Sequence, residues 1–261
     1  MRVRSQTFAS LLLVSLFSFA TGCASREARG RTAAVDCQPT VGQESREAHY
    51  ALPGLGHGLV QSPVNILSDR AVDGSHLVAT HFDHADPSSL NNTGRTIEIE
   101  FPIGPSCTYD GRDYSLKQLH FHTPSEHQID GVTFPMELHI VNLIEPENPE
   151  EPPVYLVIAI LFRMGETNEF IASFLDKVPL VEGEEDLEAG QVYLDGLDLD
   201  PIPEYFHYRG SLTTPPHTET VDWLVLKKIM QASPVQIWRV NRIEGDNARH
   251  IQALYDRSID D

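Results

Sequence analysis

The stretch Leu116-Lys-Gln-Leu-His-Phe-His-Thr-Pro-Ser-Glu-His127 decides how this chain folds and what it can bind. Its histidines His120 and His122 stand two residues apart, and in a β-strand such residues leave the same face. A second alternating run, Met136-Glu-Leu-His-Ile-Val-Asn142, follows after a turn and carries His139. Two adjacent antiparallel strands would bring the three imidazoles together. Three neutral imidazoles with an open fourth position form the arrangement of a catalytic zinc site.

Polar neighbours on the same two strands support a metal site. Gln118 and Glu137 each stand two residues before a candidate ligand, on its face of the strand. A metal-bound imidazole usually donates its other N–H to such a group. Charged and amide groups inside an apolar strand pair are costly without a partner. Strand histidines are more often ordinary core or surface residues, but these neighbours favour the metal site.

The composition is that of a globular protein with a strong acidic excess. The 261 residues suffice for one large all-β domain or two small ones, and 41% of them are hydrophobic. The formal net charge of −19 argues against nucleic acid as a partner. The acidic residues gather at 145–151 and 182–188, which is typical of solvated loops.

Residues 1–22 have the pattern of an export signal of the lipoprotein type. Arg2 and Arg4 precede a short apolar run, which is too short to span a membrane. Ala20-Thr-Gly-Cys23 then resembles a lipoprotein cleavage site, with Cys23 as the acylated residue. Plain secretion is the alternative.

The N-terminus therefore predicts an exported protein of the periplasm or cell envelope. We expect it to meet the membrane through a lipid anchor alone. Residues 23–36 are polar and rich in alanine and arginine, so we interpret them as a flexible tether. The folded domain is expected over residues 37–261.

The domain itself is expected to be mainly β, with a few short helices. A period-two pattern predicts a strand at 95–101, and the continuous apolar run at 154–162 predicts the most buried strand. Residues 168–175 are expected to form a short helix. A second helix is expected within residues 229–240, with Ser233 as N-cap and Pro234 at its first position. Further strands are expected at 76–82 and 221–226.

Several motifs together resemble those of the α-class carbonic anhydrases, especially the bacterial secreted or lipoprotein-type ones. The resemblance runs from about residue 61 to 257. The resemblance implies the fold of that family, a single α+β domain built on a large, twisted, mostly antiparallel sheet with zinc in a cone-shaped cleft. The motifs are Gln61-Ser-Pro-Val-Asn-Ile66, Gln118-Leu-His-Phe-His-Thr-Pro-Ser-Glu-His127, Glu137-Leu-His-Ile-Val141, Gly210-Ser-Leu-Thr-Thr-Pro-Pro216, Val221-Asp-Trp223 and Asn247-Ala-Arg249.

The resemblance implies a carbonate dehydratase, a lyase that hydrates carbon dioxide reversibly to bicarbonate and a proton. Its cofactor would be Zn²⁺ on the three histidines, which lowers the pKa of bound water to about 7. Thr213 and Glu126 match the pair that orients the attacking oxygen, and Thr214 would contact bicarbonate. The apolar wall around carbon dioxide matches Val141, Val157, Leu212, Val221 and Trp223.

The proton shuttle departs from the family pattern. Arg95 occupies the position where relatives carry a histidine that ferries the proton to solvent. Arginine stays protonated and cannot do this. We therefore expect slow, buffer-dependent proton export, unless His57, His84 or another histidine reaches the cleft mouth.

The cysteines depart from it as well. Bacterial relatives often carry a cysteine where this chain has His217. Cys37 and Cys107 could form a substitute disulfide in an oxidising envelope, with two free thiols as the alternative.

Two rival interpretations remain. A cupin barrel would use Glu126 as a direct metal ligand, but Tyr114 stands where its glycine is expected. A non-catalytic carbonic-anhydrase-like surface-binding domain typically lacks a ligand histidine, and this chain keeps all three. Zinc is the expected metal, although imidazole sites also accept cobalt and iron. The sequence makes no prediction of the oligomeric state.

Overall fold

The computed structural model describes residues 58–82, 84–85, 87–101, 106–187 and 192–261, all of which belong to one compact unit. The expected signal peptide and tether lie outside the described residues, and so do Cys23, Cys37 and His57. Within the described part, neither helix combines the length and apolar character needed to cross a membrane.

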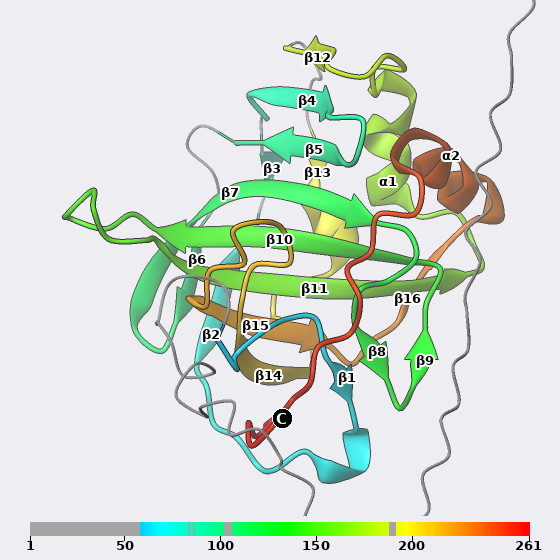
Figure 1. The fold of residues 1–261 in the computed structure, drawn as a ribbon. Helices are drawn as coiled ribbons and strands as arrows, with labels where there is room; N and C mark the ends of the chain where they lie inside the picture. Colours follow the sequence, from blue (N-terminus) through cyan, green and yellow to red (C-terminus); the bar gives the residue numbers. More distant parts are fainter. Residues whose placement is uncertain (1–57, 83, 86, 102–105, 188–191) are drawn as a thin grey trace, which may run out of the picture. The chain divides into compact units, whose positions relative to one another are not determined.

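An 11-stranded mixed sheet forms the centre of the fold (Figure 1). Its strands are β2 (Val78–His81), β4 (Ser89–Asn92), β5 (Ile97–Glu100), β6 (Ser106–Tyr109), β7 (Arg112–His122), β10 (Met136–Ile144), β11 (Val154–Met164), β12 (Glu185–Asp186), β14 (Tyr205–Gly210), β15 (Val221–Leu226) and β16 (Met230–Ala232). The main path runs β12-β4-β5-β7-β10-β11-β15-β14, with β16 beside β11, β6 beside β7 and β2 beside β6. Neighbours are antiparallel except where β11 pairs with β15 and β16. The predicted mainly-β class is confirmed.

Smaller elements complete the described part. β1 (Asn65–Ile66), β8 (Gln128–Ile129) and β9 (Val132–Thr133) form one small sheet, and β3 (His84–Ala85) pairs with β13 (Val192–Tyr193). The helices are α1 (Glu169–Phe174) and α2 (Pro234–Glu244), with 3-10 turns η2 (Ser68–Arg70), η3 (Leu175–Lys177) and η4 (Leu194–Leu197). Helix α2 contacts β5 and β7, and β7 carries the candidate ligands His120 and His122.

Both expected helices begin at the residues that cap them. The Asn168 side chain accepts the N–H of Ile171 at 3.2 Å before α1. At α2 the Ser233 hydroxyl accepts the N–H of Gln236 at 3.2 Å, and the Gln236 side chain accepts the N–H of Ser233 at 3.0 Å. Pro234 takes the first helical position, where no N–H is needed. Local side-chain chemistry therefore fixes where these helices start.

Side chains of the central strands are buried on both faces of the main sheet. Val157 belongs to one buried apolar cluster and the next residue, Ile158, to another. The cluster of Val157 also holds Val141, Tyr208 and Trp223. Because side chains alternate along a strand, the two clusters cover opposite faces. The candidate metal centre lies on the face of Val157.

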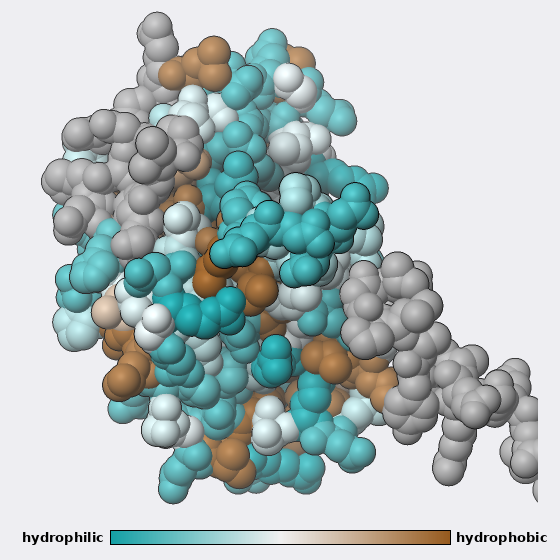
Figure 2. Space-filling model, turned by 90° about the vertical axis from the view of Figure 1, so that its left-hand side faces the viewer, coloured by the Kyte–Doolittle hydropathy of each residue, from teal (hydrophilic) through white to brown (hydrophobic). Residues whose placement is uncertain are grey.

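The described surface is mostly hydrophilic on the face that Figure 2 draws, where hydrophobic side chains show as small separate patches. Large exposed hydrophobic residues such as Leu77, Leu180 and Trp238 lie far apart in the chain. Scattered exposed apolar residues of this kind are normal for a folded protein.

Cys107 lies fully buried on β6. Burial raises the pKa of its thiol to about 12, so the thiol is protonated at neutral pH. Among the described residues it has no other cysteine to pair with. Its expected partner Cys37 lies outside the described residues, and the pairing stays a prediction.

Candidate metal centre

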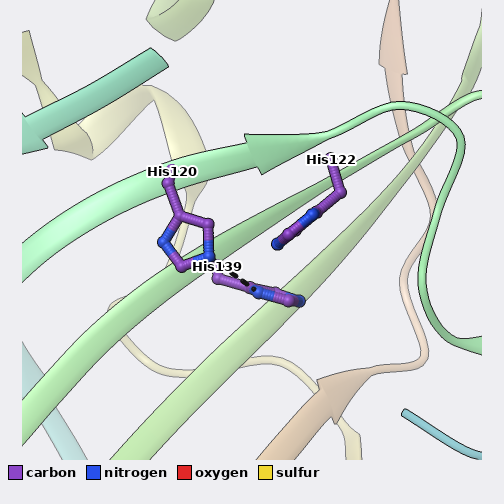
Figure 3. A group of neighbouring side chains, drawn as sticks. All are labelled: His120, His122 and His139. Carbon is purple, nitrogen blue, oxygen red and sulfur yellow. Dashed lines mark hydrogen bonds between the residues drawn. The ribbon is translucent and has the colours of Figure 1, made fainter. Parts of the chain in front are cut away.

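Strands β7 and β10 carry the three candidate ligands to one face of the sheet. His120 and His122 lie on β7, and His139 on β10 stands directly opposite His120 in the antiparallel register. Glu137 stands opposite His122. Figure 3 shows the three rings pointing toward one another from these neighbouring strands. The residue alternation in the sequence therefore positions the group.

The three imidazoles converge closely. Nδ1 of His139 lies 3.2 Å from Nε2 of His120. One ring nitrogen from each residue lies within 4.8 Å of the other two, and all three side chains are buried. Neither ring nitrogen of His122 has a hydrogen-bond partner among the described residues. Buried ring nitrogens that converge on a common point are what a divalent ion requires, so this donor set fits zinc.

Two polar side chains orient the rings. His120 Nδ1 donates to Oε1 of Gln118 at 2.8 Å, and His139 Nε2 donates to Oε1 of Glu137 at 2.7 Å. A neutral imidazole carries only one N–H. Because Nδ1 of His120 and Nε2 of His139 carry that proton, Nε2 of His120 and Nδ1 of His139 are unprotonated. These are the two nitrogens that face each other, and an unprotonated nitrogen is the form that binds a metal.

Glu137 also organises the motif that follows β7. Its Oε1 accepts from Nδ1 of His127 at 2.6 Å, and its Oε2 accepts the backbone N–H groups of Glu126 and His127, each at 2.8 Å. Burial would raise the pKa of Glu137, but His127 and His139 hold that pKa well below its usual range. His127 continues the network to the hydroxyl of Tyr208 at 2.6 Å. His127 is a functional residue that was not predicted from the sequence, although it stands at the end of the motif quoted above.

The buried surroundings keep the candidate ligands neutral. Burial lowers the pKa of His122 to about 4 and lowers the pKa of His139 below its ordinary value. Burial, followed by the nearby imidazoles, lowers the pKa of His120 well below its ordinary value. Neutral imidazoles are available to a metal without first losing a proton.

Glu126 lies beside the histidines and near Thr213. Its Oε2 is 3.4 Å from Nε2 of His122, and its Oε1 accepts the backbone N–H of Arg249 at 2.8 Å. Burial raises the pKa of Glu126, while the Arg249 N–H and the Thr213 side chain favour its ionised form. The guanidinium of Arg249 bonds elsewhere, to the carbonyl of Ser62 at 2.6 Å and to Gln61 Oε1 at 2.9 Å.

A cleft of about 340 Å³ opens over the metal centre, and His120 and His139 lie in its lining. Thr213 and Thr214 line it, together with apolar side chains from β10, β11, β15 and the loop after β14. Val221 belongs to the buried apolar cluster of Val157 and Trp223, but it is not part of the cleft lining. The expected wall residues that do line the cleft are Val141, Val157, Leu212 and Trp223.

The cleft lining offers no free histidine as a proton shuttle, but it does hold one glutamate. Arg95 is exposed and does not line the cleft. Among the described residues, the cleft lining holds no histidine besides His120 and His139. Glu98 does line it, opposite His120 in the register of β5 and β7. Burial, followed by the neighbouring Glu100, raises the pKa of Glu98 to about 7.

The chain is similar in sequence to known carbonic anhydrases and to a dioscorin. The sequence profile of the eukaryotic-type carbonic anhydrase family matches residues 47–260. A carbonic anhydrase from Neisseria gonorrhoeae is 39% identical over 206 residues, which cover 77% of this chain and 77% of that protein. Dioscorin DB3L from Dioscorea polystachya is 32% identical over 212 residues, covering 78% of this chain and 76% of that protein.

A solved structure of this family is similar to the chain in fold as well as in sequence. The α-carbonic anhydrase of Thermovibrio ammonificans, in complex with the inhibitor sulfanilamide, superposes with a TM-score of 0.70 at 31% identity. The superposition covers 78% of this chain and 88% of that chain.

Proposed function

The chain belongs to the eukaryotic-type (α) carbonic anhydrase family, and on this premise we propose that it catalyses the reversible hydration of carbon dioxide to bicarbonate and a proton. His120, His122 and His139 would hold the zinc ion. The observation that carries the proposal is the meeting of three buried ring nitrogens beneath a cleft with an apolar wall.

A zinc ion on three neutral imidazoles supplies a Lewis acid that lowers the pKa of bound water to about 7. The protein prepares the ligands for it. Gln118 and Glu137 each hold the proton on the outer nitrogen of a histidine and keep the inner nitrogen bare. The ligands are thus oriented before the ion arrives, which raises affinity.

Thr213 and Glu126 would orient the attacking oxygen. The Thr213 side chain interacts with the carboxylate of Glu126. In this role Thr213 Oγ1 would donate a hydrogen bond to that carboxylate. The hydroxyl oxygen can then only accept from the nucleophile, which directs a lone pair at the substrate. Thr214 lies on the same cleft wall and would contact bicarbonate. This contribution is one of positioning.

The apolar wall suits carbon dioxide as substrate. Val141, Val157 and Trp223 are buried and offer the cleft few hydrogen-bonding groups. The Trp223 indole N–H is already engaged by the carbonyl of Ser211 at 3.1 Å. Water gains little there, so a small nonpolar molecule displaces it at low cost.

The proposal is tested by stopped-flow hydration of carbon dioxide with purified protein. We expect the wild type to catalyse the reaction and His120→Ala to lose nearly all of the rate. His81→Ala is the matched control, because His81 is exposed on β2 and does not line the cleft. Equal rates for His120→Ala and the control would refute the assignment.

A non-catalytic binding domain is the second candidate function. The similarity to a dioscorin favours it, because dioscorin has also been crystallised in complex with ascorbate. The intact histidine group distinguishes the candidates. A purified protein that contains no zinc, gains none on dialysis and does not hydrate carbon dioxide would support the binding domain.

We also propose export and a lipid anchor at Cys23. The support is the sequence of residues 1–23 alone. Mass spectrometry of the membrane fraction tests this, with an acylated N-terminal peptide expected for the wild type. Cys23→Ser should move the protein to the soluble fraction, and an unchanged distribution would contradict the anchor.

A further inference from the structure

A second cluster of histidine and aspartate side chains lies on the face of the main sheet opposite the candidate metal centre. Tyr208 on β14 stacks with Trp223 on β15, and Trp223 packs against His139. Since side chains alternate along a strand, the adjacent residues His207 and Asp222 leave the other face. The main sheet therefore separates the cluster from the cleft.

Three side chains from distant parts of the chain meet in this cluster. His207 Nδ1 lies 2.7 Å from Oδ1 of Asp260, and His76 Nε2 lies 3.3 Å from Oδ2 of the same carboxylate. One ligand atom of each lies within 4.8 Å of the other two. Asp260 is fixed by its backbone, which exchanges hydrogen bonds of 2.7 and 3.0 Å with that of His207.

Each histidine also faces a second carboxylate with its other nitrogen. Nδ1 of His76 lies 2.7 Å from Oδ2 of Asp110, and Nε2 of His207 lies 3.3 Å from Oδ1 of Asp222. The hydroxyl of Tyr109 also contacts His76 Nδ1, at 2.9 Å. A carboxylate behind an imidazole is the usual outer partner of a metal-binding histidine.

The cluster has an excess of negative charge. Burial lowers the pKa of His76, but the carboxylates of Asp110 and Asp260 outweigh burial and raise that pKa above its ordinary value. The neighbouring Arg209 is mostly exposed, with its Nε 3.7 Å from Asp222. Lys227 Nζ is engaged by Asp261 at 2.5 Å. The carboxylates around His76 thus favour a positive charge at that side chain.

Solvent reaches the cluster through a cavity of about 380 Å³. His76, His207 and Asp260 line it, together with Gly74 and Glu204. The cavity exceeds by far the volume of a single water molecule, so a hydrated ion can enter and exchange ligands there.

We propose that His76, His207 and Asp260 bind a second divalent transition-metal ion, independently of the zinc in the cleft. Two imidazoles and one carboxylate suit zinc, copper or nickel better than calcium or magnesium, which prefer oxygen ligands alone. The ion joins three segments far apart in the sequence, so its binding stabilises the C-terminal segment against the sheet.

The competing account is an ion-pair cluster in which protonated histidines bridge the aspartates without a metal. The two accounts differ in stoichiometry. We would dialyse purified full-length protein, free of any histidine tag, against buffered micromolar zinc and count the metal bound per chain. Wild type is expected to bind one zinc more than His76→Gln, and His81→Gln is expected to match the wild type.

His76→Gln is the informative variant because the His76 side chain is 21% exposed and tolerates replacement better than a core residue. The apparent dissociation constant for the additional zinc should rise at least tenfold in this variant. Its rate of carbon dioxide hydration should stay unchanged, because the cluster lies across the sheet from the cleft. A loss of the cleft zinc would change that rate, so the two sites are told apart.

Asp110→Asn provides a second variant, since it removes only the outer carboxylate and lowers affinity without removing a ligand. An equal zinc count for wild type, His76→Gln and Asp110→Asn at every free zinc concentration would overturn the proposal. It would leave the ion-pair cluster as the correct account.

Discussion

The carboxylate of Glu137 lies 2.7 Å from Nε2 of His139 and thereby leaves Nδ1 of that ring bare toward His120. The same carboxylate accepts from His127 and from two backbone N–H groups, so its position is fixed from four sides. Burial works against its ionisation, but the two facing histidines keep its pKa well below the usual range. One buried anion thus aims a metal ligand.

This relationship predicts the effect of Glu137→Gln. An amide cannot accept all four bonds and carries its own N–H groups toward backbone donors. We expect zinc affinity to fall by about 10- to 100-fold, measured by competition with a chromophoric chelator. Glu185→Gln, at an exposed position on β12, is the control. An affinity equal to that of the control would show that Glu137 does not orient the ligand.

Thr213→Val tests the orientation of the attacking oxygen. Valine has nearly the same shape as threonine but lacks the hydroxyl, so zinc and the cleft should remain while the lone pair is no longer directed. We expect kcat to fall by about 100-fold, typical of losing one positioned hydrogen bond. Stopped-flow rates on zinc-quantified protein measure this, with the exposed Thr133→Val as control. A rate within twofold of wild type would exclude the role.

Proton export should depend on buffer. Arg95 cannot release a proton at neutral pH and lies outside the cleft lining. We expect kcat to rise with imidazole concentration before it reaches a plateau, because the buffer then carries the proton that no cleft histidine carries. Initial rates over a series of imidazole concentrations at constant ionic strength measure this. A rate independent of buffer would point to an internal carrier, and Glu98→Gln would then identify whether Glu98 serves.

Glu244 gives a prediction for stability against pH. Its Oε1 accepts the N–H of Ile97 at 2.7 Å, while its Oε2 is buried without a partner among the described residues. Burial raises its pKa well above the ordinary value. A folded-state pKa above the unfolded one means that this group's contribution is fully present below the unfolded pKa and is lost as pH rises through the folded pKa.

Glu244→Gln keeps an acceptor for Ile97 and removes the charge at the last residue of α2, where the helix dipole disfavours an anion. We expect the variant to be more stable than wild type at pH 8, by roughly 1–3 kcal/mol, because the neutral amide avoids the cost of keeping a charged carboxylate buried. The two should be nearly equal near pH 4. Urea unfolding at both pH values measures this, and a variant less stable than wild type at pH 8 would contradict it.

The repeating patterns of the sequence predicted much of the fold. Strand β15 was expected at its observed bounds, and Ser233 and Pro234 marked the start of α2 because capping is local chemistry. The alternation in β7 and β10 placed the three histidines on one face, since strand geometry follows from backbone periodicity. The parallel pairing of β11 with β15 depends on long-range topology, which local patterns do not encode.

The site was predictable where its residues share a strand pair, and not where it depends on long-range contacts. Gln118 and Glu137 were identifiable because each stands two residues from a ligand. Glu126 accepts the backbone N–H of Arg249, which lies 123 residues further along the chain, and no local pattern in the sequence predicts this contact. The cluster of His76, His207 and Asp260 joins segments more than 50 residues apart, so no spacing in the sequence predicts it.

The central claim is that His120, His122 and His139 hold one metal ion, and crystallography at the zinc absorption edge tests it most directly. We expect an anomalous-difference peak within coordination distance of Nε2 of His120, a ring nitrogen of His122 and Nδ1 of His139. Crystals grown in zinc whose map shows no peak between the three rings, or one ring turned away from the other two, would contradict the account.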